Sequence, residues 1–114
     1  MKLPIKCSFF AVAALLSNFS VASQLNNVSV AAININKGLG EYLFIRTSVA
    51  PVQNGCQTDL NWNYVLPLND ALSKNIFSIL LAAQTSKAKV TLTGTGTCSP
   101  WGIEYLTDIT ISSN

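Results

Sequence analysis

Histidine is absent from the 114 residues of this sequence, and only 11% of the residues are charged. Histidine is the commonest general base and the commonest metal ligand, so its absence removes the usual starting point for acid–base and metal chemistry. The acidic residues are scattered singly, and no nucleophile-elbow, phosphate-loop or metal-ligand spacing occurs. Ser99, beside Cys98, has no histidine to activate it. We therefore expect a protein that is not an enzyme and that holds no metal ion or cofactor.

Charge of either sign is also scarce in the part of the chain that we expect to fold. The formal net charge is +2, but Lys2 and Lys6, two of the seven basic residues, precede an apolar run at the N-terminus. Without them, five basic residues face five acidic ones. Nucleic acids and anionic lipids attract a basic surface, so this neutral composition favours neither partner.

The first 23 residues have the pattern of a secretory signal peptide. Lys2 and Lys6 are followed by an apolar run of about ten residues, and small side chains follow near positions 20–23. The run is too short to cross a bilayer, which takes roughly 20 apolar residues. Cleavage after Ala22 or Ser23 fits this pattern, and a buried N-terminal helix is the alternative. We take residues 1–23 as the signal peptide and 24–114 as one secreted or periplasmic domain.

Three cysteines are present, and cleavage reduces them to one pair. Cys7 lies in the signal peptide, which leaves Cys56 and Cys98 in an oxidising compartment. We predict that they form a disulfide, which closes a loop of about 43 residues and contributes roughly 4 kcal/mol on the chain-entropy model. A redox-active or metal-binding pair is the alternative, but the C-x-x-C spacing for it is missing.

Five segments have the alternation, or the β-branched and aromatic content, of β-strands. A change in the phase of alternation near Ala31 and Ala32 predicts a β-bulge in the first of them. The predicted strands cover about residues 28–36, 41–49, 61–68, 89–96 and 102–111.

One segment, between the third and fourth strands, has helical spacing and can be capped by Asn69 or Asp70. Phe77 and Leu81 lie beyond its core stripe and widen the apolar arc to roughly 200°, more than one face of a small barrel should cover. We predict that these two residues contact a neighbouring subunit in a homo-oligomer; the alternative is that they lie under the loop of residues 50–60. The predicted core stripe is Leu72, Ile76, Ile79, Leu80 and Ala83.

The order of these elements is β-β-β-α-β-β, which is the order of the OB-fold, a five-stranded Greek-key barrel. Closure of a barrel would hide the sheet edges that a small β protein otherwise exposes. We therefore predict a mainly β, OB-fold domain. An open antiparallel sheet covered on one face by the helix is the alternative.

OB barrels bind ligands through strands 2 and 3 and through the loops between strands 1–2 and 4–5. Here these loops are residues 36–40 and 96–102, and the second holds a tryptophan close to a cysteine and a glycine. A rigid aromatic ring beside hydroxyls and amides suits the apolar face and polar edges of a sugar. The alternative is that the aromatic residues belong to the core. The candidate glycan-binding residues are Asn36, Lys37, Trp62, Tyr64, Ser99 and Trp101.

Residues 69–112 contain, in order, an amphipathic helix, an Ala-Lys-Val strand start at 88–90, the cysteine Cys98 and a closing strand through 109–111. This order resembles the receptor-binding B subunits of the one-A, five-B bacterial toxins, such as the cholera, heat-labile enterotoxin, subtilase-cytotoxin and pertussis-like groups. The cysteine pairing and the lack of an N-terminal helix depart from the enterotoxin pattern. The resemblance implies an OB barrel, a pentameric ring, a receptor glycan and a secreted enzymatic A subunit as partner.

Two functions are consistent with these observations. The first is a secreted, non-enzymatic domain that binds host or environmental glycans as a ring-forming B-type subunit. The second is a stand-alone secreted or periplasmic structural or inhibitor domain without a glycan ligand. A neighbouring reading frame for a secreted enzyme would favour the first.

Overall fold

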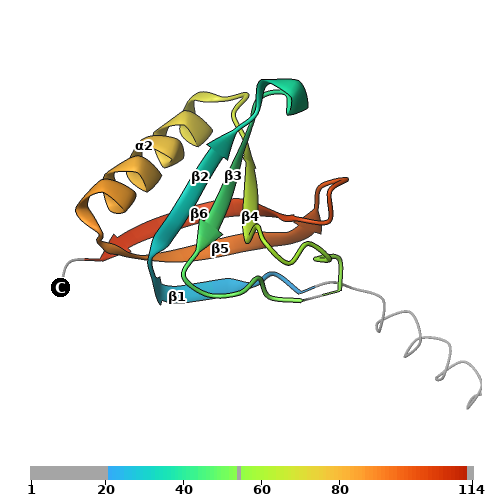
Figure 1. Cartoon of the computed structure of the whole chain (residues 1–114), viewed down its shortest axis with the longest axis horizontal. Coiled ribbons are helices and arrows are strands. Elements are labelled where there is room, and N and C mark those ends of the chain that lie inside the picture. Colours follow the sequence, from blue (N-terminus) through green and yellow to red (C-terminus); the bar gives the residue numbers. More distant parts are fainter. Residues whose placement is uncertain (1–20, 54, 113–114) are drawn as a thin grey trace, which may run out of the picture.

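The computed structural model describes residues 21–53 and 55–112, which form six β-strands, one short 3-10 helix and one α-helix (Figure 1). Most of the predicted signal peptide, residues 1–20, lies outside the described residues. The elements are β1 (Gln24–Val28), β2 (Val30–Ile35), η1 (Lys37–Leu39), β3 (Tyr42–Thr47), β4 (Tyr64–Pro67), α2 (Ala71–Ser86), β5 (Lys89–Cys98) and β6 (Glu104–Ser112).

The six strands form one curled sheet, a half-barrel, in the order β1-β5-β6-β4-β3-β2. Neighbouring strands are antiparallel except β4 and β6, which run parallel. Ser29 alone separates β1 from β2, so one short segment supplies the strands at both ends of the sheet. The helix α2 packs against β2 and β6.

The prediction of a mainly β domain with one helix between the third and fourth predicted strands is confirmed. The predicted count of five strands is too low, because β1 was missed. Asn27 has a positive φ of 57°, and the pairing of β1 with β5 shifts between Leu25 and Val28. This irregularity breaks the two-residue period by which a strand is recognised. The predicted bulge is present, since the pairing of β2 with β3 shifts between Val30 and Ala32.

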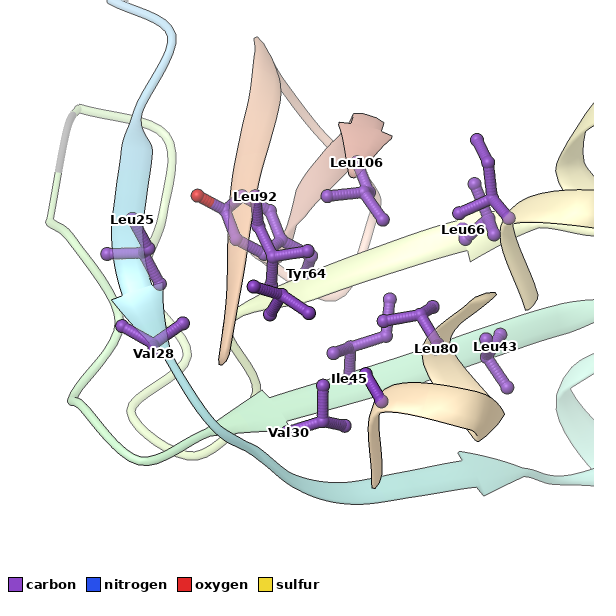
Figure 2. Close-up of a cluster of buried hydrophobic side chains, with 13 residues drawn as sticks. Leu25, Val28, Val30, Leu43, Ile45, Tyr64, Leu66, Leu80, Leu92 and Leu106 are labelled. Atoms are coloured by element: carbon purple, nitrogen blue, oxygen red, sulfur yellow. The ribbon is translucent and has the colours of Figure 1, made fainter. Parts of the chain in front are cut away.

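The main core lies between the inner face of the sheet and α2. Figure 2 shows side chains from all six strands and from α2 pointing toward one another. On β3, Leu43 and Ile45 enter this core and are fully buried, while the alternate residues Tyr42 and Phe44 lie on the opposite face. The buried members are Leu25, Val28, Val30, Leu43, Ile45, Tyr64, Leu66, Ile76, Leu80, Ala83, Val90, Leu92 and Leu106.

The helix is capped as expected, but its buried stripe differs from the prediction. Oδ1 of Asp70 accepts a hydrogen bond from the main-chain N of Ser73 at 2.7 Å. Leu72 and Ile79, predicted to face the core, are 69% and 37% exposed. The sheet covers the other side of the apolar arc, where Phe77 is partly buried against the core. The buried residues of α2 are Ile76, Leu80 and Ala83.

The carboxylate of Glu104 is buried inside the curled sheet, at 1% exposure. It accepts hydrogen bonds from the hydroxyl of Ser23 at 2.7 Å, from the main-chain N of Ser23 at 3.1 Å and from the main-chain N of Gly96 at 2.9 Å. The hydroxyl of Tyr64 lies 2.8 Å from that of Ser23. Because the single Ser23 proton is donated to Glu104, the Tyr64 hydroxyl is the donor between these two groups. A side chain on Gly94 would overlap the carboxylate, so only glycine fits there.

Tyr64 makes the stability of this network sensitive to alkaline pH. Burial raises the pKa of the Tyr64 hydroxyl above its ordinary value of 10.0, and the nearby charge of Glu104 raises the pKa further. The unfolded chain then loses the tyrosine proton at a lower pH than the folded chain does. The contribution of Tyr64 to the free energy of unfolding is therefore complete below about pH 10. It falls as the pH rises toward the pKa of Tyr64 in the folded state.

We predict that Tyr64→Phe lowers the free energy of unfolding by about 1 kcal/mol at neutral pH, because one hydrogen bond is lost. The variant should lose less stability than the wild type between neutral pH and about pH 11. Urea unfolding at a series of pH values measures both quantities. Parallel pH dependences for the two proteins would contradict this role of Tyr64.

Candidate functional site

A second apolar cluster lies on the outer face of the sheet, opposite the main core. Its buried members are Phe44 on β3, Val65 on β4 and Ile103 just before β6. Four aromatic side chains that are partly exposed pack around them. These are Tyr42, Trp62, Trp101 and Tyr105.

Two edge-to-face contacts and one tilted contact join the rings of Tyr42, Phe44 and the two tryptophans. Phe44 stands between the two tryptophans, with ring centres 5.3 Å from Trp101 and 6.0 Å from Trp62. Tyr42 meets Trp101 edge-on at 5.1 Å, with an interplanar angle of 81°. Such T-shaped pairs are favourable beyond the area that they bury. Both tryptophan rings are therefore held in place while part of each stays accessible.

A hollow of about 280 Å³ opens between these rings and the loop after β2. Its apolar wall includes Phe44, Trp62 and Trp101, and Asn36 and Asp59 are among its polar lining residues. The volume is close to the lower end of known ligand pockets, roughly 300 Å³, and suits a single small ring. The other lining residues are Asn34, Leu39 and Ile103.

The long loop between β3 and β4 is fastened to the sheet by the disulfide. Cys56 and Cys98 are bonded, with Cα atoms 5.8 Å apart, so the predicted pairing is confirmed. Cys98 ends β5, three residues before Trp101, and Cys56 lies six residues before Trp62. The one bond therefore limits the motion of both segments that carry the tryptophans.

Gln57 joins the same loop to β6 through its buried side chain, which is 3% exposed. Its Nε2 donates to the main-chain oxygens of Asp59 and Trp62, both at 3.0 Å. Its Oε1 accepts a hydrogen bond from the main-chain N of Glu104 at 2.8 Å. All the polar atoms of this amide side chain are thus used to set the position of Trp62 relative to β6.

Asp59 and Gly102 also fix the loop that carries Trp62 against the loop that carries Trp101. Oδ1 of Asp59 accepts from the main-chain N of Asn61 at 2.8 Å and of Trp62 at 2.7 Å. The carbonyl of Gly102 accepts from the main-chain N of Thr58 at 2.9 Å and of Asp59 at 3.1 Å. Gly102 has a φ of +74°, and a Cβ there would overlap the Thr58 hydroxyl. The residue after Trp101 therefore has to be glycine for the two loops to meet.

The structure brings some of the predicted site residues together. Asn36, Trp62 and Trp101 line the same hollow. Lys37 lies instead at a different hollow of about 420 Å³. Ser99 is buried at 6% exposure, and its hydroxyl makes no hydrogen bond within the part of the chain that the structure describes.

The prediction that Tyr64 binds a glycan is wrong, because Tyr64 is a core residue. The side chain is 1% exposed, and its hydroxyl faces Ser23 inside the sheet, so it cannot contact a ligand from solvent. On β4, Tyr64 and Leu66 point into the main core while Val65 lies in the outer cluster. The predicted third strand covered 61–68, but Trp62 lies before β4, in the loop that Asp59 shapes.

Phe44, Asp59 and Asn34 belong to the hollow and were not predicted. Alternation along the strand of residues 41–49 could have indicated Phe44, since it places Tyr42, Phe44 and Arg46 on one face. No comparable pattern marks Asp59, whose position depends on the folded loop. Arg46 is exposed beside the hollow, with its guanidinium carbon 5.4 Å from the centre of the Trp62 ring.

The described residues contain no group of three or more cysteine, aspartate or glutamate side chains that could hold a metal ion. None of their helices is long and apolar enough to span a membrane. No protein-family model matches the chain, and no curated protein matches its sequence.

We predict that replacing the disulfide, in a Cys56→Ser and Cys98→Ser double variant, lowers the free energy of unfolding by about 3–5 kcal/mol. The expected cause is the greater freedom of the unfolded chain, together with loosening of the two loops. Urea unfolding followed by tryptophan fluorescence measures the loss. Equal free energies of unfolding for the double variant and the wild type would show that the disulfide does not stabilise the two loops that carry the tryptophans.

Proposed function

We propose that this chain is a secreted OB-fold domain that binds a glycan in the hollow between Trp62 and Trp101 and performs no catalysis. The observation that carries the proposal is the hollow itself. Two rigid tryptophan rings stand there beside amide and carboxylate groups, on a frame fixed by the disulfide. A site that is rigid before binding loses little conformational entropy when the ligand arrives.

The sheet topology supports the assignment to the OB-fold. If β1 and β2, joined through Ser29, count as one bent strand, the chain has five strands with the helix between the third and the fourth. That one strand then pairs with β5 at its start and with β3 at its end. A strand shared by both ends of a sheet is the connection that a closed barrel requires.

The position of the hollow supports a binding role. Its lining comes from β2 and β3, from the loops that follow β2 and β5, and from the long loop between β3 and β4. In OB-folds the outer face of the second and third strands and the corresponding two loops bind oligosaccharides or oligonucleotides. The balance of five basic and five acidic residues after residue 23 favours the neutral ligand over the polyanion.

The chemistry of the lining suits a sugar ring. The C–H face of a sugar packs on an indole ring, and its hydroxyls both donate and accept hydrogen bonds. Asn34 and Asn36 offer amide donors and acceptors, and Asp59 offers a carboxylate acceptor. Arg46, stacked on Trp62, adds a donor at the rim.

We further propose that the domain forms a homo-oligomeric ring, a pentamer by analogy with the toxin B subunits it resembles, with a secreted A subunit as its partner. The exposed residues of α2 support a ring. Leu81 is 44% exposed on one flank, and Leu72, about 180° away around the helix, is 69% exposed on the other. A head-to-tail ring needs two different contact surfaces on each subunit. Phe77 contributes the edge of the first flank that the core leaves uncovered.

We expect Trp101→Ala to weaken binding at least about tenfold to whichever glycan is identified on an array, because the stacking face is lost. Leu60→Ala is the matched control: Leu60 lies in the same loop as Trp62, is 75% exposed and does not line the hollow. The array is probed with the purified exported protein, and affinities are measured by calorimetry.

Two results would count against glycan binding in the hollow. One is an array on which the wild type binds nothing, which would favour a stand-alone structural or inhibitor domain. The other is unchanged affinity in Trp101→Ala while its disulfide and thermal unfolding show that it is folded.

We expect the exported protein to form an oligomer at micromolar concentration, and Leu81→Ser and Phe77→Ser to shift it toward the monomer. Asn75→Ser, an exposed polar change on the same helix, should have no effect. Light scattering coupled to gel filtration gives the masses. A wild type with the mass of one mature chain would rule out the ring.

A further inference from the structure

Ser23 is built into the core, although the residues just before it are not. Ser23 is 8% exposed, whereas Val21 and Ala22 are exposed. Its main-chain N and its hydroxyl bind the two carboxylate oxygens of Glu104, at 3.1 Å and 2.7 Å. Its carbonyl accepts a hydrogen bond from the main-chain N of Gly94 at 2.9 Å. The burial boundary therefore falls at the peptide bond that precedes Ser23.

We propose that an endopeptidase of the export pathway cuts the bond between Ala22 and Ser23, and that the new α-ammonium group of Ser23 binds the buried carboxylate of Glu104. The reaction is hydrolysis. It consumes one water, leaves Ala22 with a new carboxylate on the released peptide, and leaves Ser23 with its nitrogen as a protonated amine. The proposal rests on export, as the proposed function does, but not on glycan binding.

The sequence before the bond fits such a cut. Cleavage after Ala22 places Ser20 and Ala22, both small, at the third and first positions before the bond. Cleavage after Ser23 fits the same pattern, but it would remove the residue that binds both oxygens of Glu104. The structure thus selects between two sites that the sequence leaves open. It moves the start of the mature domain from Gln24 to Ser23.

Processing changes the chemistry of one contact, between the Ser23 nitrogen and the Glu104 carboxylate. Before the cut, the Ser23 nitrogen is an amide with one N–H donor. After the cut it is an ammonium with three donors and a positive charge, and hydrogen bonds between charged groups are shorter and stronger. The main-chain N of Gly96 and, through Ser23, the Tyr64 hydroxyl also face the carboxylate, and both are neutral donors. The ion pair is buried, so salt screens it little.

The order of events follows from the same contacts. Once folded, Ser23 is held by Glu104 and Gly94, and Ala22 lies close against Gly96. A protease needs an extended, accessible segment on both sides of the bond, so the cut precedes folding. The mature chain then folds with a stronger contact at its first residue than the precursor can make.

Periodate provides a chemical test of the first residue. An N-terminal serine carries an amino group and a hydroxyl on adjacent carbons, and periodate cleaves the bond between these two carbons. The full chain is produced in an exporting host, and the intact mass of the secreted product gives its first residue. We expect the product to begin at Ser23. In the native state, where both reacting groups bind Glu104, periodate should oxidise it at least about tenfold more slowly than in denaturant.

A product that begins at Gln24, or that keeps residues 1–22, overturns the proposal. So does an N-terminal Ser23 that reacts equally fast in the native and denatured states. Glu104→Gln should speed the native reaction, whereas the matched control Asp108→Asn, an exposed carboxylate on the same strand, should not. If Glu104→Gln does not fold, Tyr64→Phe, which removes one hydrogen bond to the Ser23 hydroxyl, should give a smaller increase. Loss of glycan binding alters none of these results.

Discussion

A carboxylate withdrawn from water must be surrounded by hydrogen-bond donors, and Glu104 obtains its donors from distant parts of the chain. Ser23 comes from the start of the domain, and Gly96 comes from the adjacent strand β5. Gly94 leaves the space that the carboxylate fills. These contacts tie Ser23 and β5 to β6. Tyr64 closes the network from β4, so three strands and the residue that precedes β1 meet at one charged group.

The same residue connects the interior to the candidate site. The main-chain N of Glu104 binds Gln57, and Gln57 binds the carbonyl of Trp62. Together with the disulfide, this link gives the hollow a rigid wall. Trp62 was predicted on the third strand but lies in the loop before β4. The loop positions of Asn36 and Trp101 could be predicted from the OB order of elements. The role of Asp59 could not, because it depends on a turn that exists only in the folded loop.

The features that could be predicted from the sequence are set by neighbouring residues. The features that could not be predicted depend on contacts between residues far apart in the chain. The cap at Asp70 and the helix after it follow from neighbouring residues. Helical spacing defines an apolar arc but not which part of it the sheet covers, so Leu72 and Ile79 were wrongly placed in the core. Ser23 has the small side chain of a cleavage site, and its contact with a carboxylate 81 positions away had no local pattern.

We propose that a sugar ring binds between the two tryptophans, and the indole groups themselves can report this binding. The sequence has only two tryptophans, so a nitrogen-15 spectrum of the folded protein contains two indole N–H signals to follow during a glycan titration. Trp62→Phe and Trp101→Phe assign them. We predict that both indole signals and the side-chain amide signals of Asn34 and Asn36 shift together, with one dissociation constant. A glycan that saturates the protein while both indole signals stay unchanged would contradict it.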